Sequence, residues 1–98
     1  MNRVALNSER MQFMRSFEYI ITDPLGLHAR PAGLFYKEAS LFESVITVSK
    51  GAKTANAKRI FSLMGLNIKH GDRIRIDVEG ADEDMAAEKM DAFLRDNL

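Results

Sequence analysis

The sequence predicts an α+β fold in which an antiparallel sheet carries helices on one side. Segments of period two and segments of helical period follow one another in the order β-α-β-β-α-β-α. The strand segments alternate between apolar and polar residues, which favours one buried face, one wet face and antiparallel pairing. The chain has 98 residues, a length that suits one core and one domain.

The first three elements are a strand, a turn and a helix. Apolar and polar residues alternate over residues 17–22, which indicates a half-buried strand. Residues 23–26 (Asp-Pro-Leu-Gly) break it, and residues 29–41 follow with an apolar stripe at helical spacing. Pro31 falls in the first turn of this helix, where its missing N–H costs nothing. His28 is therefore predicted at, or just before, the helix N-terminus.

The middle of the chain predicts a hairpin and a short helix. Residues 45–50 alternate cleanly, and a turn leads to a polar segment, residues 53–56, which we expect at the edge of the sheet. Apolar residues at helical spacing then begin at Ile60 and stop near Gly65 or Asn67.

The last two elements are a strand and a helix. Residues 73–78 give the clearest alternation in the chain. Asp82 is predicted to cap the final helix, with two further acidic residues favourable to the helix dipole. Met85 and Met90 are both expected in the core. Residues 1–13 show little periodicity and are interpreted as an extension of a domain formed by residues 14–98.

Composition excludes several classes of protein. The chain has 14 basic and 14 acidic residues, so it offers no large basic field for nucleic acid. It has no cysteine, and His28 and His70 lack the spacing of a zinc motif, so we expect no metal and no cofactor. The chain contains no apolar run long enough for a signal peptide or a membrane span, which predicts a cytoplasmic protein without membrane insertion.

The start of the first helix combines three features that suit phosphate chemistry. The first N–H groups of a helix have no intrahelical partner and bind anions, phosphate above all. Positive charge is disfavoured there, so the neutral, nucleophilic imidazole of His28 is favoured. Arg30 adds a fork of donors that matches phosphate oxygens. Spacing alone leaves a plainer interpretation open, because a histidine beside an arginine at a helix start is commonly a surface residue.

The segment from Gly26 to Ala32 (GLHARPA) resembles the active-site motif of the histidine-containing phosphocarrier proteins (HPr) of the bacterial phosphotransferase system. The similarity runs without a gap over about 85 residues from Met14. Beyond the motif it is carried by Lys53, Thr54, Asn56, Lys58, Met64, Gly65 and residues 79–83. The resemblance implies an open-faced β-sandwich, four antiparallel strands covered on one side by three helices.

The resemblance also implies a function. His28 would accept a phosphoryl group at Nδ1 from enzyme I, which draws it from phosphoenolpyruvate, and would pass it to IIA components of sugar permeases. Ala29 and Arg30 would bind the phosphate, and Arg30 would assist transfer. The protein would thus be a carrier and not an enzyme, and we expect a monomer. An apolar surface for partners is implied at Ile60, Phe61 and Met64.

Two positions depart from the family pattern. Leu25 stands where many members have a small polar residue, and its apolar side chain cannot make the local hydrogen bond that such a residue would make. Arg59 replaces the regulatory serine of many Gram-positive members, which argues against control by a serine kinase; Ser62 is interpreted as an ordinary helix position.

Two alternative functions stay open. One is a carrier in a regulatory, nitrogen-related relay, and the other is a catabolite-regulating module without phosphotransfer. Retention of His28 and Arg30 speaks against the second. His70 is expected to be a solvated loop residue.

Overall fold

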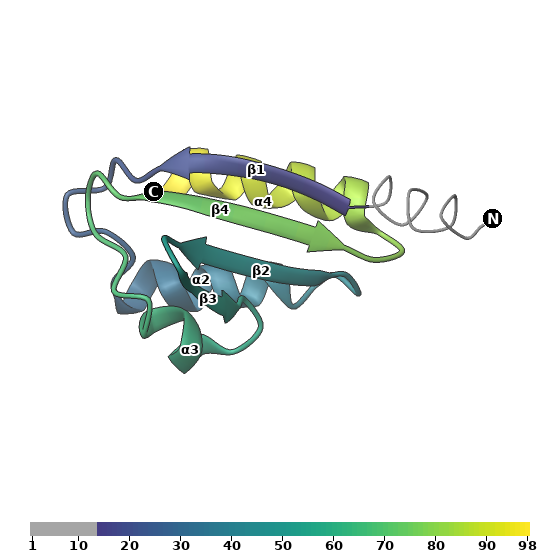
Figure 1. Ribbon diagram of the computed structural model, residues 1–98, viewed down its shortest axis with the longest axis horizontal. Coiled ribbons are helices and arrows are strands. Elements are labelled where there is room, and N and C mark those ends of the chain that lie inside the picture. The colour runs from purple at the N-terminus through teal and green to yellow at the C-terminus, as the bar shows by residue number, and fades with distance from the viewer. Residues whose placement is uncertain (1–13) are drawn as a thin grey trace.

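The computed structural model describes residues 14–98 (Figure 1). The order β-α-β-β-α-β-α is confirmed. The elements are β1 (Met14–Ile20), α2 (Ala29–Ala39), β2 (Val45–Lys50), β3 (Lys53–Asn56), α3 (Ile60–Met64), β4 (Arg73–Glu79) and α4 (Glu83–Asn97). The extension predicted over residues 1–13 lies outside the described residues. No helix among residues 14–98 is both long and apolar enough to cross a membrane.

The strands form one antiparallel sheet in the order β1-β4-β2-β3. β4, the last strand along the chain, lies between β1 and β2, and β3 lies at an edge as predicted. α2 and α4 run along the same face of the sheet (Figure 1), while α3 packs against α2 and β3. The predicted sheet with helices on one side is therefore confirmed.

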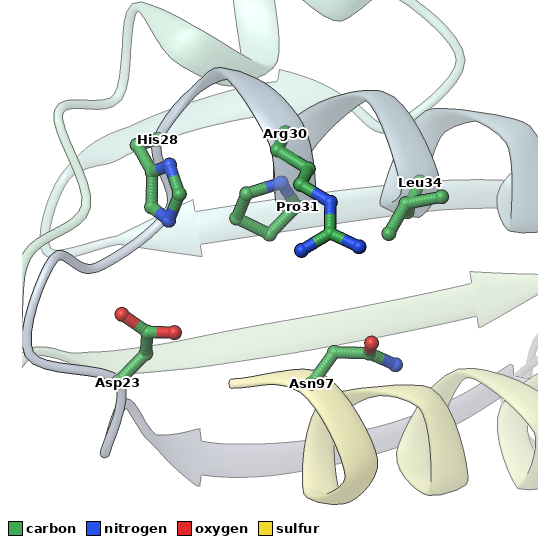
Figure 2. Close-up of a pocket in the computed structure, with 6 residues that line it drawn as sticks. All are labelled: Asp23, His28, Arg30, Pro31, Leu34 and Asn97. Atoms are coloured by element: carbon green, nitrogen blue, oxygen red, sulfur yellow. The ribbon is translucent and has the colours of Figure 1, made fainter.

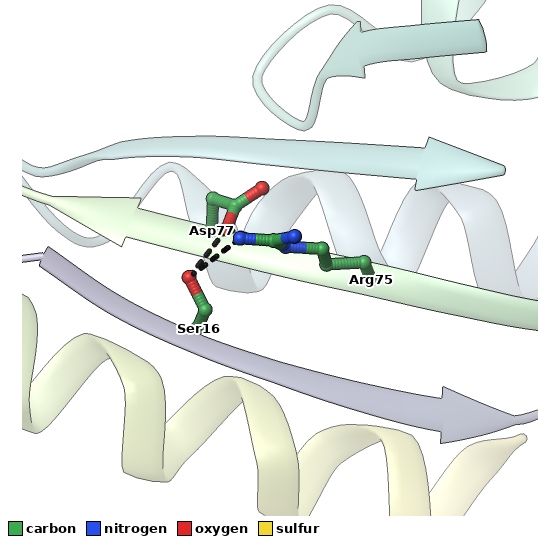
Figure 3. Close-up of polar contacts among 3 residues, drawn as sticks. All are labelled: Ser16, Arg75 and Asp77. Atoms are coloured by element: carbon green, nitrogen blue, oxygen red, sulfur yellow. Dashed lines mark hydrogen bonds and ion pairs between the residues drawn. The ribbon is translucent and has the colours of Figure 1, made fainter. Parts of the chain in front are cut away.

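The other face of the sheet is polar. In its middle the Ser16 hydroxyl donates to Asp77 Oδ1 over 2.5 Å, and Arg75 Nε donates to the same oxygen over 2.9 Å (Figure 3). Arg75 thus shares Asp77 with a residue of the neighbouring strand, since Ser16 pairs with Asp77 in register. Such cross-strand contacts suit a face that stays in water.

The core lies between the sheet and the two long helices. Phe35 of α2 is fully buried, and its ring lies 5.6 Å from that of Phe93 in α4. The sheet contributes the inward residues of β2 and β4, which alternate with exposed or half-exposed neighbours. The largest fully buried apolar side chains are Phe35, Ile21, Ile46, Leu63, Ile74, Ile76, Met90, Leu94, Val48 and Val78.

Several element boundaries and one core residue differ from the predictions. β1 begins three residues before the predicted Phe17 and ends two residues early, at Ile20, while β4 extends one residue further, to Glu79. The early start follows from pairing with β4, which continues to Met14 opposite Glu79. α2 ends at Ala39, two residues before the predicted end. Met90 is fully buried, but Met85 is 58% exposed, so its predicted place in the core was wrong. Five positions along a helix turn a side chain by about 140°, which moves it to another face.

Asp82 occupies the predicted N-cap position of α4, but its side chain does not cap the helix. Its carboxylate instead accepts hydrogen bonds from the backbone N–H groups of Glu43 and Ser44 and from the Ser44 hydroxyl, at 2.9, 3.0 and 2.5 Å. The Glu83 carboxylate accepts a hydrogen bond from the Gly80 N–H over 3.0 Å. The acidic run at this helix start is thus used partly for a tertiary contact, which the sequence pattern did not reveal.

Candidate functional site

His28 is the N-cap residue of α2, as predicted. Its backbone is extended, with φ −86° and ψ −173°, and its carbonyl accepts the first helical hydrogen bond, from the Ala32 N–H over 2.9 Å. The neighbouring Leu27 and Pro31 are buried, whereas His28 itself is exposed. The imidazole makes no capping hydrogen bond. The backbone is therefore held while the side chain projects toward solvent.

The loop before His28 packs directly on the loop that follows α3. Gly26 has φ +68°, and a Cβ there would lie 2.5 Å from the Ile68 carbonyl oxygen and 2.7 Å from Lys69 Cα. The Leu27 N–H donates to the same Ile68 oxygen over 3.0 Å. Only glycine fits this contact, so Gly26 sets how closely the histidine loop approaches its support.

The supporting loop is itself held by an ion pair. Lys50 Nζ lies 2.8 Å from Asp72 Oδ2, and that oxygen also accepts the Lys69 N–H over 2.8 Å. The hydrogen bond from Lys50, helped by the Lys69 N–H, lowers the pKa of Asp72 below its ordinary value of 3.8. The chain of contacts thus runs from Lys50 through Asp72 to the residues behind Gly26.

His28 and Arg30 face one small concavity of about 100 Å³. Figure 2 shows the imidazole and the guanidinium directed toward the same gap, with the Asp23 carboxylate on the opposite side. The lining residues are Asp23, His28, Arg30, Pro31, Leu34 and Asn97. The structure therefore brings together the two predicted residues and Pro31, and adds three that sequence reasoning missed: Asp23, Leu34 and Asn97. Asp23 stands close enough along the chain to be suspected, but nothing local points to Asn97.

The donors at this site find no acceptor in the described part of the chain. Among residues 14–98 the Arg30 guanidinium has no hydrogen-bond or ion-pair partner, and the imidazole of His28 has none either. The N–H groups of Ala29 and Arg30 lie in the first turn, where a helix supplies no acceptor, and no loop group among residues 14–98 accepts from them. The site can thus offer an anion both backbone and guanidinium donors.

On its other side His28 borders a wider groove formed with the end of α3. Met64 and Leu25 line this groove together with His28, and so does His70. The Leu25 side chain is 72% exposed, and its backbone N–H donates to Asp23 Oδ1 over 2.8 Å. His70 is an exposed loop residue as predicted, with Nδ1 3.2 Å from the Thr22 carbonyl oxygen.

The three residues predicted to contact partners differ in exposure. Phe61 is 85% exposed and Met64 38%, whereas Ile60 is half-buried. A Cβ on Gly33 of α2 would lie 4.0 Å from Ile60 Cδ1, so Ile60 packs toward that helix. Met64 shares the groove with His28, while Arg59 holds the N-cap position of α3 without capping it.

Comparison with known proteins gives consistent matches. The family described as "PTS HPr component phosphorylation site" matches residues 15–96. The phosphocarrier protein HPr of Mycoplasma genitalium is 42% identical over 85 residues, which are 86% of this chain and 97% of that protein. The HPr-like protein Crh of Halalkalibacterium halodurans is 48% identical over 69 residues, 70% of this chain and 82% of Crh.

Solved structures agree with these matches. HPr from Bacillus anthracis has a TM-score of 0.78 and 40% identity, over 83% of this chain and 96% of that one. The chain therefore belongs to the HPr family, the phosphocarrier proteins of the phosphotransferase system.

Proposed function

We propose that His28 is the phosphoryl acceptor, through Nδ1, receiving the group from enzyme I and passing it to IIA components of sugar permeases in the cytoplasm. The observation that carries this proposal is the concavity at the start of α2. There the imidazole and the guanidinium, neither of which has a partner among residues 14–98, face the same space (Figure 2). A nucleophile and an anion-binding group so placed are what a transient phosphohistidine requires.

The chemistry is a direct exchange of bonds. The lone pair of Nδ1 forms a bond to phosphorus as the bond between phosphorus and the donor breaks, and the donor keeps that electron pair. Arg30 and the first N–H groups of α2, those of Ala29 and Arg30, balance the charge of the phosphoryl oxygens. Passing the group to the next protein reverses these steps, so the carrier returns unchanged.

Partners dock, in this proposal, on the apolar surface formed by Ile60, Phe61 and Met64. Phe61 and Met64 are more exposed than the packing of a short helix requires, and exposed apolar residues beside a reactive group commonly mark an interaction surface. Residues 14–98 act as the functional domain, as a monomer. Control by a serine kinase at the start of α3 is not expected, because Arg59 stands there.

The test combines the protein with enzyme I and phosphoenolpyruvate and measures acid-labile phosphate by intact mass. Wild type should gain one phosphoryl group, and His28→Ala none. His70→Ala is the matched control, since this second histidine lines the neighbouring groove, and it should behave as wild type. Acid-labile phosphate on His28→Ala would refute the assignment.

The same assay tests the docking surface. Phe61→Ala should slow phosphorylation by enzyme I without lowering the unfolding midpoint, because Phe61 buries little of its side chain. Ser62→Ala, the exposed neighbour on α3, is the control. A Phe61→Ala variant that loses stability but keeps its transfer rate would place Phe61 in the core instead.

A further inference from the structure

Asp23 is firmly held near the start of the loop that leaves β1. Its backbone N–H donates to the Leu98 carbonyl oxygen over 2.8 Å, and its own carbonyl accepts the Gly26 N–H over 3.0 Å. Its side-chain Oδ1 accepts the Leu25 N–H over 2.8 Å. Asp23 is also half-buried. These contacts fix both the backbone and one oxygen of the carboxylate. Moving the carboxylate would break the hydrogen bond from Leu25.

The Asp23 carboxylate keeps one oxygen without a bond from the described residues and faces the histidine site. Among residues 14–98 no group bonds to Asp23 Oδ2. Figure 2 shows the carboxylate directed across the concavity toward His28, with the Arg30 guanidinium in the same space. Asp23 and Arg30 are the two charged residues of the lining besides the histidine itself. A phosphoryl group on His28 would therefore meet one positive and one negative charge.

We propose that Asp23 makes the phosphoryl group on His28 easier to transfer, because its fixed negative charge repels that group. The proposal rests on the function proposed above. A phosphoryl group carries about −1.5 to −2 charges near neutral pH. Arg30 attracts it, while Asp23 raises the free energy of the phosphorylated form and leaves the unphosphorylated form almost unaffected. A carrier benefits from this balance, since it must release its group as well as accept it.

The size of the effect follows from Coulomb's law. For a site this open to water the effective dielectric constant is high, and charges several ångströms apart change the phosphorylation equilibrium by about threefold to tenfold. The group transfer itself stays as written above, with one P–N bond formed at His28 for each bond broken at the donor. Asp23 touches no reacting atom in this scheme.

A purely structural role for Asp23 is the main competing explanation, because the bond from Leu25 makes it a turn residue. Asp23→Asn separates the two roles. The asparagine side-chain oxygen can still accept the Leu25 N–H, but the charge is lost. Glu18→Gln is the matched control, since Glu18 lies on the outer face of the sheet, paired with Arg73, and the substitution changes net charge equally.

The experiment equilibrates each protein with enzyme I at a fixed ratio of phosphoenolpyruvate to pyruvate. The ratio of phosphorylated to free carrier is then read by intact mass. Asp23→Asn should raise this ratio about threefold to tenfold over wild type, with an unchanged unfolding midpoint. The purified phosphorylated variant should also pass its group to IIA more slowly. Glu18→Gln should match wild type.

Two outcomes would overturn the inference. One is a wild-type ratio in Asp23→Asn, and the other is a change of equal size in Glu18→Gln. Wild type and His28→Ala are included in the same series. If wild type gains no acid-labile phosphate, or His28→Ala gains it, the proposed function fails; if both behave as expected and Asp23→Asn does not, only the role of Asp23 fails.

Discussion

The two ends of the sheet differ in whether their polar side chains are hydrogen-bonded. At the end where β4 leads into α4, the Asp82 carboxylate accepts three hydrogen bonds from Glu43 and Ser44, and Ser44 is fully buried. At the other end, where β1 leads into α2, His28 and Arg30 have no partners among residues 14–98 and face solvent (Figure 2). The two ends lie at opposite sides of the ribbon in Figure 1.

The difference separates structural from functional polar groups. A buried polar group must be paired, since an unpaired one costs about 1–3 kcal/mol, and the Asp82 end meets that requirement in full. At the His28 end the loop is held by the backbone of Gly26 and Leu27 and by the Lys50–Asp72 ion pair, while the side chains of His28 and Arg30 stay available for an anion. Substitutions at the Asp82 end are thus expected to change stability alone, whereas substitutions at the His28 end are expected to change phosphoryl transfer as well.

The largest expected effect compares one glycine from each end. Gly26→Ala and Gly80→Ala both place a Cβ within 2.7 Å of backbone atoms at positive φ. Each should lower the free energy of unfolding by about 2–4 kcal/mol, from backbone strain and overpacking. Only Gly26→Ala should also reduce the transfer rate of the folded protein, because it displaces the backbone before His28.

Urea denaturation measures the first effect, and the enzyme I assay at low temperature measures the second. Gly51→Ala is the control, since Gly51 also has positive φ but its Cβ would meet nothing within 4 Å. It should cost only about 1 kcal/mol. Equal transfer rates in the Gly26 and Gly80 variants would contradict the functional division between the two ends.

A smaller effect is expected from one polar side chain at each end. Ser44→Ala removes a hydrogen bond to Asp82 and should cost about 1–2 kcal/mol of stability with no change in transfer. Arg30→Ala should leave stability within about 0.5 kcal/mol, because the side chain has no partner among residues 14–98 to lose, but should slow transfer about tenfold to a hundredfold. Arg30→Lys should be intermediate, since it keeps the charge and loses the fork.

These values come from denaturation curves and single-turnover transfer, taken on the same preparations. The functional division between the two ends would be contradicted if Arg30→Ala unfolds the protein, or if Ser44→Ala slows transfer in a fully folded sample.

The smallest effect concerns acid, and it involves one carboxylate at each end. The Ser44 hydroxyl and the Glu43 N–H lower the pKa of Asp82, and Lys50 lowers that of Asp72, both from an ordinary 3.8. A carboxyl whose folded pKa lies below its unfolded pKa stabilises the fold above the unfolded value and loses that contribution as pH falls through the folded one. Stability should therefore decline below about pH 4. Both groups are only half-buried, so screening by water keeps the effect modest.

Urea denaturation between pH 6 and pH 2 measures this decline. Asp82→Asn and Asp72→Asn should each flatten it, and Asp77→Asn serves as a comparison on the open face of the sheet. At pH 6 only Asp72→Asn should also affect transfer, since Asp72 holds the loop behind Gly26. A pH profile that neither variant alters would show that other groups govern acid unfolding.

Much of the fold could be predicted from local patterns. Alternation located β2, and the turn that follows it located the polar strand β3, both with their observed bounds. The ends of β1 and α2 were missed because strand pairing, and not the strand's own sequence, decides how far β1 extends. Asp82 was correctly placed at the N-cap, but its bonds to Glu43 and Ser44 span about 40 positions, and no local rule anticipates them.

The sequence by itself determined that His28 and Arg30 lie together at the start of a helix. Their separation by one residue and the proline that follows place His28 at the N-cap and Arg30 in the first turn. Tertiary structure alone decided that the concavity also holds Asn97 from the end of α4, and that Gly26 rests on Ile68. Contacts between distant segments depend on which strands pair and on how helices pack on them. A local pattern of polar and apolar residues specifies neither the pairing nor the packing.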